Sequence, residues 1–135
     1  MATITAIEGV GDKQAEKLRA AGIKTCEGLL DAGNTKKRRQ KLAEATKISE
    51  KSLLTWVNHA DLMRVKGVSG RYSELLEKAG VDSVVELKTR NAEKLAEAME
   101  KANNRLKNKV LRTPSPKVVQ NWIDNAKTLK KVVAH

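Results

Sequence analysis

The sequence predicts an all-α protein built from two copies of one helical unit. Aromatic residues make up only 2% of the 135 residues and Phe is absent, so the core must come from Leu, Val, Ile, Ala and the two Trp. Such a composition favours helices. Apolar residues recur at helical spacing after each of two glycine-containing turns. The chain is long enough for one compact domain, or for two small units that share a core.

The first part of each copy contains the glycine turn. A shift of 58 residues places the stretch AIEGVGDKQAEKLRAAGIKT (6–25) on the stretch RVKGVSGRYSELLEKAGVDS (64–83), with Gly9 on Gly67. Apolar positions coincide on both sides of the turn, and the match is too long to arise by chance. The chain is therefore an internal duplication.

The last part of each copy is an amphipathic segment that contains Trp. A shift of 66 residues, rather than 58, places SEKSLLTWVNHA (49–60) on SPKVVQNWIDNA (115–126), with Trp56 on Trp122. The second copy is therefore longer in its middle. Because the two Trp occupy equivalent positions on amphipathic helices, we expect them to pack in the core rather than to stack on bases.

The first copy predicts four helical segments in order. A helix follows the first glycine turn and ends at Gly22, and a short helix capped by Thr25 comes next. A third helix spans about 35–45. The fourth begins at the cap Ser49 and continues through 62–64 into the second glycine turn, of which it forms the first arm.

The second copy predicts the same order. Its first helix ends at Gly80, and the short helix that follows has a capping box made by Ser83 and Glu86. A longer helix spans about 91–102. The last helix runs from 115 to about 133, with Pro in its first helical position, where the missing N–H is harmless.

The copies divide the chain into a first repeat, 1–63, and a second repeat, 64–135, which we expect to form one compact unit. No helix precedes the first glycine turn, and no turn follows the helix 115–133. We therefore expect this last helix to fold back over 7–21 and to close a pseudo-twofold domain.

The turn sequences resemble a known DNA-binding motif. IEGVGDKQAEKL resembles the helix-hairpin-helix motif, in which an apolar residue, Gly, an apolar residue and Gly precede a helix with Ala at a fixed position. The second copy, VKGVSGRYSELL, departs from it, because Ser69 replaces the second Gly, Gly70 comes one place late and Ser73 replaces the Ala. Nearly the whole chain also resembles a bacterial family of tandem helix-hairpin-helix proteins that has only a domain-of-unknown-function label.

The resemblance implies binding of the duplex DNA backbone without sequence specificity. The physical reason is independent of the family: glycine allows a tight turn and close approach, and the unpaired N–H groups at the next helix start attract a phosphate. Lys13 and Arg71 occupy matching positions beside the turns. Asp12 would repel a phosphate, although it also suits a helix start. The alternative is that both turns are only bends between packed helices.

Positive charge is concentrated in two further segments. The net charge is +11, and KKRRQK (36–41) and KANNRLKNKVLRTPSPK (101–117) are the most basic stretches. A polyanionic partner explains such a field, while a solvated basic face is the alternative. The residues that we predict to bind nucleic acid are Gly9, Val10, Gly11, Lys13, Gly67, Val68, Ser69, Gly70, Arg71, Lys36, Lys37, Arg38, Arg39, Lys41, Arg105, Lys107, Lys109 and Arg112.

The partner predicted from these features is duplex DNA, with RNA as an alternative ligand. The competing function is a non-catalytic protein-interaction adaptor, in which the same helices bind another protein or a second copy of the chain. Exposed basic turns would favour nucleic acid, whereas an apolar patch of several hundred Å² would favour the adaptor.

We expect no enzymatic activity, cofactor, metal site or membrane association. Helix-hairpin-helix glycosylases use a catalytic Asp, for which Asp31 is the nearest match, but base flipping needs an apolar pocket that a chain so poor in aromatics is not expected to build. His59 has no Ser or Cys partner, and the single Cys26 suits a small buried residue. With no signal sequence and no apolar run of about 20 residues, a cytoplasmic location is expected.

Overall fold

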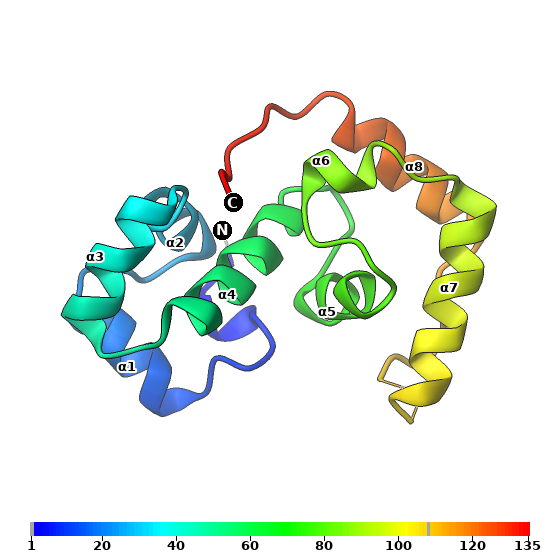
Figure 1. Cartoon of the computed structure of the whole chain (residues 1–135). Coiled ribbons are helices and arrows are strands. Elements are labelled where there is room, and N and C mark those ends of the chain that lie inside the picture. Colours follow the sequence, from blue (N-terminus) through cyan, green and yellow to red (C-terminus); the bar gives the residue numbers. More distant parts are fainter. Residues whose placement is uncertain (1, 108) are drawn as a thin grey trace. The chain divides into compact units, whose positions relative to one another are not determined.

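The computed structural model describes residues 2–107 and 109–135, and over these residues it confirms the all-α prediction (Figure 1). It contains eight α-helices and one short 3-10 helix in the described part of the chain. The chain divides into two compact units: the first holds the residues up to Asp61 together with Val132–His135, and the second holds Leu62–Lys131. The last four residues thus belong to the first unit rather than to the second.

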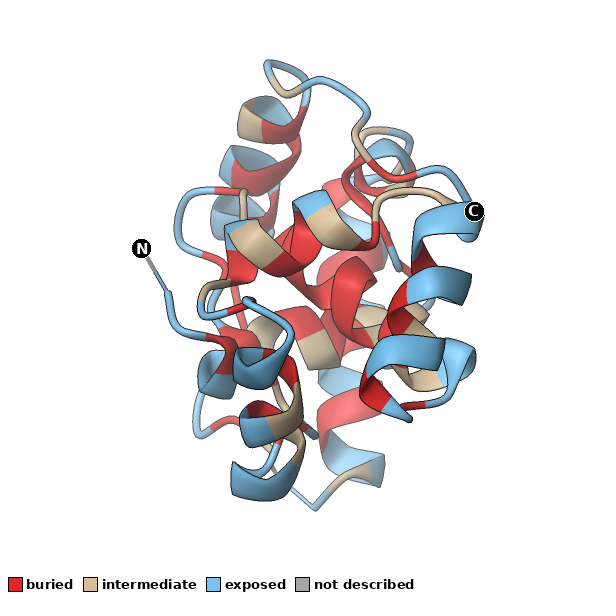
Figure 2. Ribbon diagram, turned by 90° about the vertical axis from the view of Figure 1, so that its left-hand side faces the viewer, coloured by how far each residue is buried: buried red, intermediate tan, exposed pale blue. Residues whose placement is uncertain are grey.

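The first unit consists of η1 (Ile4–Ala6), α1 (Asp12–Ala20), α2 (Cys26–Ala32), α3 (Lys36–Thr46) and nearly all of α4 (Glu50–Leu62). Thr25 and Thr35 cap α2 and α3 by accepting hydrogen bonds from the N–H groups of Gly28 and Arg38 at 3.0 and 3.2 Å. Each cap satisfies an amide that the helix leaves unpaired. The apolar side of these helices is buried and the opposite side is exposed (Figure 2).

The C-terminal tail is bound to the first unit through backbone and side-chain contacts. The N–H of Ala134 donates to the carbonyl of Asn34 at 2.8 Å, and Nε2 of His135 lies 2.8 Å from Oδ1 of Asn58. The guanidinium of Arg39 donates to the carbonyls of Gly33 and Ala134, both at 2.8 Å. The tail therefore completes this unit although it is distant in sequence.

The second unit consists of α5 (Gly70–Lys78), α6 (Val84–Leu87), α7 (Ala92–Arg105) and α8 (Pro116–Ala126). α8 lies against α6 and α7, and α5 also contacts α7 (Figure 1). Ser115 caps α8 as predicted, by accepting from the N–H of Val118, and Asn91 caps α7 by accepting from the N–H of Lys94. The core between these helices is aliphatic with one indole, and includes Leu75, Leu76, Met99, Trp122 and Ile123.

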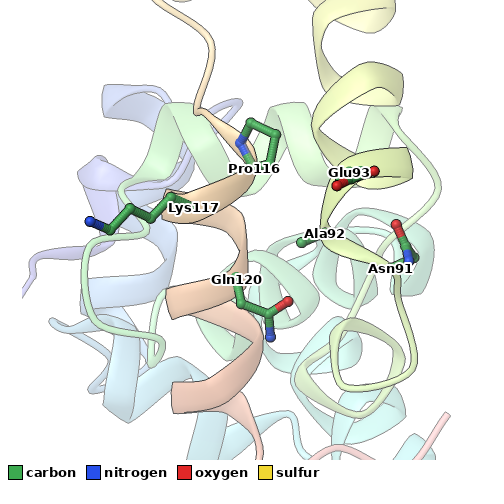
Figure 3. Close-up of a pocket in the computed structure, with 6 residues that line it drawn as sticks. All are labelled: Asn91, Ala92, Glu93, Pro116, Lys117 and Gln120. Atoms are coloured by element: carbon green, nitrogen blue, oxygen red, sulfur yellow. The ribbon is translucent and has the colours of Figure 1, made fainter.

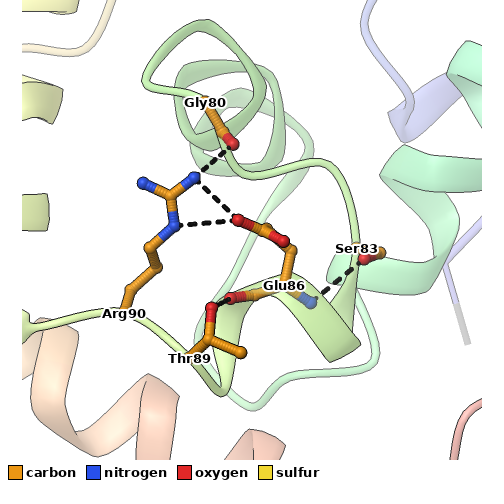
Figure 4. A network of polar contacts seen from close by, with 5 residues as sticks. All are labelled: Gly80, Ser83, Glu86, Thr89 and Arg90. Atoms are coloured by element: carbon orange, nitrogen blue, oxygen red, sulfur yellow. Dashed lines mark hydrogen bonds and ion pairs between the residues drawn. The ribbon is translucent and has the colours of Figure 1, made fainter.

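The capping box predicted at α6 is only half formed. Ser83 Oγ accepts from the N–H of Glu86 at 3.2 Å, as expected. The carboxylate of Glu86 instead accepts from Nε and Nη2 of Arg90 at 3.1 and 2.8 Å (Figure 4). The same Arg90 donates to the carbonyl of Gly80 at 2.7 Å. A guanidinium offers a stronger, charge-assisted partner than a backbone amide, so it draws the carboxylate away.

The last helix is shorter than predicted, because α8 ends at Ala126 rather than near 133. Cationic side chains of the same unit bind the carbonyls that follow it. Lys88 Nζ donates to the carbonyl of Leu129 at 2.7 Å, and Arg64 Nη2 donates to that of Lys130 at 2.9 Å. These donors satisfy carbonyls that a longer helix would have paired internally, so the chain leaves the helix here.

Each unit covers its own glycine turn with its own Trp. The Nε1 atom of Trp56 in α4 lies 3.3 Å from where a Cβ on Gly9 would stand, and that of Trp122 in α8 lies 3.2 Å from the same point on Gly67. Both Trp are buried, at 6% and 4% exposure, as predicted. At the first turn α4 stands where we expected the last helix, and within the second unit α8 packs against α6 and α7.

Candidate nucleic-acid interface

The two glycine turns have nearly the same backbone. Gly9 and Gly67 adopt φ values of +93° and +91°, which only glycine adopts without strain. The following N–H groups, of Val10 and Val68, donate back to the carbonyls of Ile7 and Val65 at 3.2 and 3.1 Å. Both glycines are exposed while both valines are buried. Of the predicted site residues, the valines therefore anchor the turns, and the glycines face the solvent.

A nine-residue helix begins directly after each turn. Its N-cap is Gly11 in the first unit and Ser69 in the second, with φ and ψ of −82° and 178° against −86° and 177°. Gly11 has no side chain to cap α1, whereas Ser69 Oγ accepts from the N–H of Tyr72 at 3.4 Å. The first amides of α1 are therefore more open to an external anion than those of α5.

One cation stands at the second helical position after each turn. Lys13 and Arg71 are both exposed there. Asp12, also exposed, precedes Lys13 in the first unit, while the matching Gly70 is buried and carries no charge. The first turn thus has open amides beside a carboxylate, and the second has a capped helix start without one. Neither turn is the better phosphate site on every count.

The basic segment at the start of α3 is mostly exposed, with one exception. Lys36, Lys37, Arg38 and Lys41 are exposed, but Arg39 is only 3% exposed. Its burial lowers the pKa of the guanidinium, and its bonds to backbone carbonyls hold the C-terminal tail in place. The prediction that Arg39 contacts nucleic acid is therefore wrong, because its charge serves inside the first unit.

The connection between α7 and α8, residues 106–115, carries most of the second predicted basic segment. The side chain of Asn103 is buried and bonds both the N–H and the carbonyl of Val110, at 2.9 and 3.0 Å. Lys109 is half-buried and pairs with Glu74 at 3.3 Å, so it is committed within the unit. Arg105, Lys107 and Arg112 are exposed. Asn108, within the same segment, lies outside the described residues.

A pocket of about 460 Å³ opens beside the second glycine turn. Two aromatic rings line it, those of Tyr72 and Trp122, whose centroids are 5.4 Å apart at an interplanar angle of 56°. Its other lining residues are Gly67, Arg112, Thr113, Pro114, Ser115 and Val118. The sequence prediction missed this pocket and assumed that so few aromatics could not line one. The extra length of the second copy marked where the two copies differ but did not indicate a cavity.

A second pocket, of about 380 Å³, lies between the first residues of α7 and α8 (Figure 3). Glu93 stands on its α7 side, and Lys117 on α8 extends away from α7. Because the carboxylate of Glu93 lines this pocket together with Lys117, it opposes the binding of a phosphate there. The pocket at the second glycine turn is the better candidate.

Comparison with known proteins adds a family and no role. The family described as Domain of unknown function (DUF4332) matches residues 8–129, which covers both glycine turns and both Trp. Neither the curated proteins nor the solved structures contain a match to this chain. Within the described residues, no helix is long and apolar enough to cross a membrane.

Proposed function

Since the chain belongs to the DUF4332 family, whose description assigns no role, we propose its function from the molecule itself. The proposed function is the binding of duplex DNA without sequence specificity. The DNA phosphates would be held at two helix-hairpin-helix turns. The observation that carries the proposal is the matched pair of turns. Each presents an exposed glycine at positive φ, a helix that begins three residues after that glycine, and an exposed cation at the second helical position.

Three features of each turn favour the binding of a phosphate. Unpaired amides at a helix start carry partial positive charge, and the helix dipole adds to it. The glycine at positive φ lets the chain turn tightly, so that the next helix begins directly after the turn. Lys13 or Arg71 then supplies a full charge nearby. These contacts involve the phosphate and not the base edges, so they position a duplex without reading its sequence.

The overall charge supports the same proposal. With 27 Lys and Arg against 16 Asp and Glu, the protein has a net charge of +11. The exposed cations at the start of α3 and in the connection 106–115 add to the field around the turns. A duplex that meets such a surface releases bound counterions, which gives an affinity that falls steeply with salt.

The alternative function, a non-catalytic protein-interaction adaptor, rests on a different observation. Leu111 is fully exposed and Val118, beside the pocket of the second unit, is 40% exposed. Exposed aliphatic side chains beside a pocket are typical of surfaces that bind other proteins. Val85 is the other large apolar side chain that the described residues expose, so the adaptor rests on few exposed apolar side chains. The charge and the matched turns therefore favour nucleic acid.

The direct test is fluorescence anisotropy of a labelled random duplex of about 25 base pairs across a salt series. We expect Lys13→Glu and Arg71→Glu each to weaken binding about tenfold or more at low salt, uniformly across sequences. The plot of log K against log salt should become less steep for each variant, by about 0.9, which is the contribution of one phosphate contact.

Lys51→Glu is the matched control, since Lys51 is exposed on α4 and the substitution changes the net charge by the same amount. It should weaken binding far less. Equal losses in all three variants would leave only a diffuse electrostatic attraction, and an absence of binding at low salt would turn the search towards protein partners.

A further inference from the structure

The second unit contains a feature that a pure phosphate-binding module does not need. Beyond the turn lies the pocket of about 460 Å³, within the size range of small-ligand pockets. The second glycine turn itself forms part of its wall, through Gly67. A ligand held at this turn by its phosphate would therefore have the pocket directly beside it.

We propose that this pocket binds an unpaired nucleobase of the strand whose phosphate is held at the second glycine turn. The proposal rests on the proposed function and narrows its ligand from plain duplex to nucleic acid with an unpaired base, such as an overhang. A paired base is stacked inside the duplex and cannot enter a pocket without being extruded.

The lining chemistry matches a base. Tyr72 is half-buried and offers part of its ring, while Trp122 is almost fully buried and adds only a small part of its surface to the lining. Unpaired bases characteristically stack on aromatic rings and on the planar guanidinium of Arg, which Arg112 provides at the same pocket. Thr113 and Ser115 add polar groups. An apolar peptide side chain would use the rings but would have no use for the adjacent phosphate site.

The pocket is held in shape by contacts that reach the connection from α5 and α7. The two hydrogen bonds of Asn103 fix Val110, and the ion pair to Glu74 fixes Lys109. The Tyr72 hydroxyl donates to the carbonyl of Arg112 at 3.2 Å, which joins the aromatic wall to the loop. A pocket that is already formed loses little conformational entropy on binding.

The first unit provides a natural comparison, because it has neither an aromatic residue at the position of Tyr72 nor a long connection before its last helix. Under the shift of 58 residues, Gln14 stands at the position of Tyr72. Between α3 and α4 only residues 47–49 intervene, against 106–115 between α7 and α8. The connection is thus seven residues longer in the second copy, and it takes up most of the eight residues by which the shifts of 58 and 66 differ.

The test compares two labelled duplexes with a short single-stranded overhang, one with normal bases and one with abasic sites in the overhang. The two carry the same phosphates, so the electrostatic contribution is shared. We expect the base-containing overhang to bind roughly 5- to 100-fold more tightly, the range that one base–aromatic contact provides. Because stacking is not a counterion effect, this ratio should change little with salt.

Substitutions at the pocket test whether the difference in affinity between the two overhangs arises there. Tyr72→Ala should reduce the ratio towards one, Tyr72→Phe should keep most of it, and Gln14→Ala, the matched change in the first unit, should leave it unaltered. In Trp56→Phe protein, Trp122 is the only Trp left, and its fluorescence should change with the base-containing overhang and not with the abasic one. This readout also reports on the pocket if Tyr72→Ala lowers stability.

The outcomes separate the two proposals. If both overhangs bind equally and Trp122 does not respond, the pocket is not a base site, although duplex binding at the turns stands. If neither binds at low salt, the proposed function fails and the base site fails with it. A ratio that survives Tyr72→Ala would also overturn the assignment to this pocket.

Discussion

The first and second glycine turns share a backbone and differ in the groups around it. Both place glycine at φ near +90° against the indole of a following helix. They differ at the N-cap, which is Gly11 in the first copy and Ser69 in the second. They also differ at the third helical residue, which is Gln14 in the first copy and Tyr72 in the second. The backbone and the cation that the turns share support the proposed phosphate contact at both, whereas the side chains that differ would modify it. Duplicated architecture therefore does not imply duplicated chemistry.

The largest effect expected on stability comes from replacing the shared glycines. Gly9→Ala and Gly67→Ala each put a side chain at positive φ and bring its Cβ to 3.3 or 3.2 Å from a buried indole nitrogen. We expect each to lower the free energy of unfolding by about 1–3 kcal/mol, measured by urea denaturation.

Gly11→Ala is the control for these two substitutions. Gly11 has φ of −82°, and an added Cβ meets nothing within 4 Å among the described residues. The only cost expected is that of a poorer N-cap, of a few tenths to about 1 kcal/mol. If Gly9→Ala proved as mild as Gly11→Ala, the equivalence drawn between the turns on backbone grounds would be lost.

A smaller effect is expected from exchanging the two N-caps. Gly11→Ser should stabilise the first unit by a few tenths of a kcal/mol, because it supplies the cap that Ser69 gives α5, and Ser69→Gly should cost about the same. Duplex binding should move in the opposite sense, since the serine oxygen occupies an amide that would otherwise face the phosphate. Thermal denaturation and anisotropy on the same samples test both, and a change of both quantities in the same sense would contradict this account.

The smallest effect concerns Cys26, whose counterpart in the second unit is Val84. Burial, with a further contribution from the charge of Glu27, raises the pKa of the thiol from 9.0 to about 11. At pH 8 the folded protein should therefore contain about a hundredfold less thiolate than the unfolded chain. Alkylation by iodoacetamide should be correspondingly slow and should accelerate in urea. Rapid alkylation of the folded protein would show that Cys26 is exposed.

The same shift sets the sign of a pH effect on stability. Because the folded pKa lies above the unfolded one, the contribution of the protonated thiol is fully present below about pH 9 and is lost as the pH rises towards 11. Cys26→Val, which inserts the residue of the second unit, should remove this part of the pH dependence.

The sequence predicted the parts of the fold that depend on local patterns. Thr25, Ser49 and Ser115 were identified as helix caps, and their hydroxyls do accept from amides at the helix starts. Trp56 and Trp122 were identified as core residues because they lie on amphipathic faces. The predictions that failed depended on tertiary contacts. Nothing local marks the end of α8 at Ala126, which cations from other segments determine.

The candidate site shows the same limit. Sequence could identify the glycines and the cations beside them, but it could not separate Arg39 from its exposed neighbours, because only folding brings the carbonyls of Gly33 and Ala134 to it. The pocket at Tyr72 was missed because its walls come from α5, α8 and the connection 106–115. The length change between the two copies indicated where the second unit differs and gave no indication of a cavity.

The measurement that tests the central claim most directly is a titration of the ¹⁵N-labelled protein with a short duplex, followed through backbone amide chemical shifts. The account predicts the largest shifts at Gly11–Gln14 and Ser69–Tyr72, the starts of α1 and α5, with little change in the cores of the two units. Shifts confined to the start of α3 or to 106–115, with both turns unchanged, would contradict it and leave the glycine turns as architecture alone.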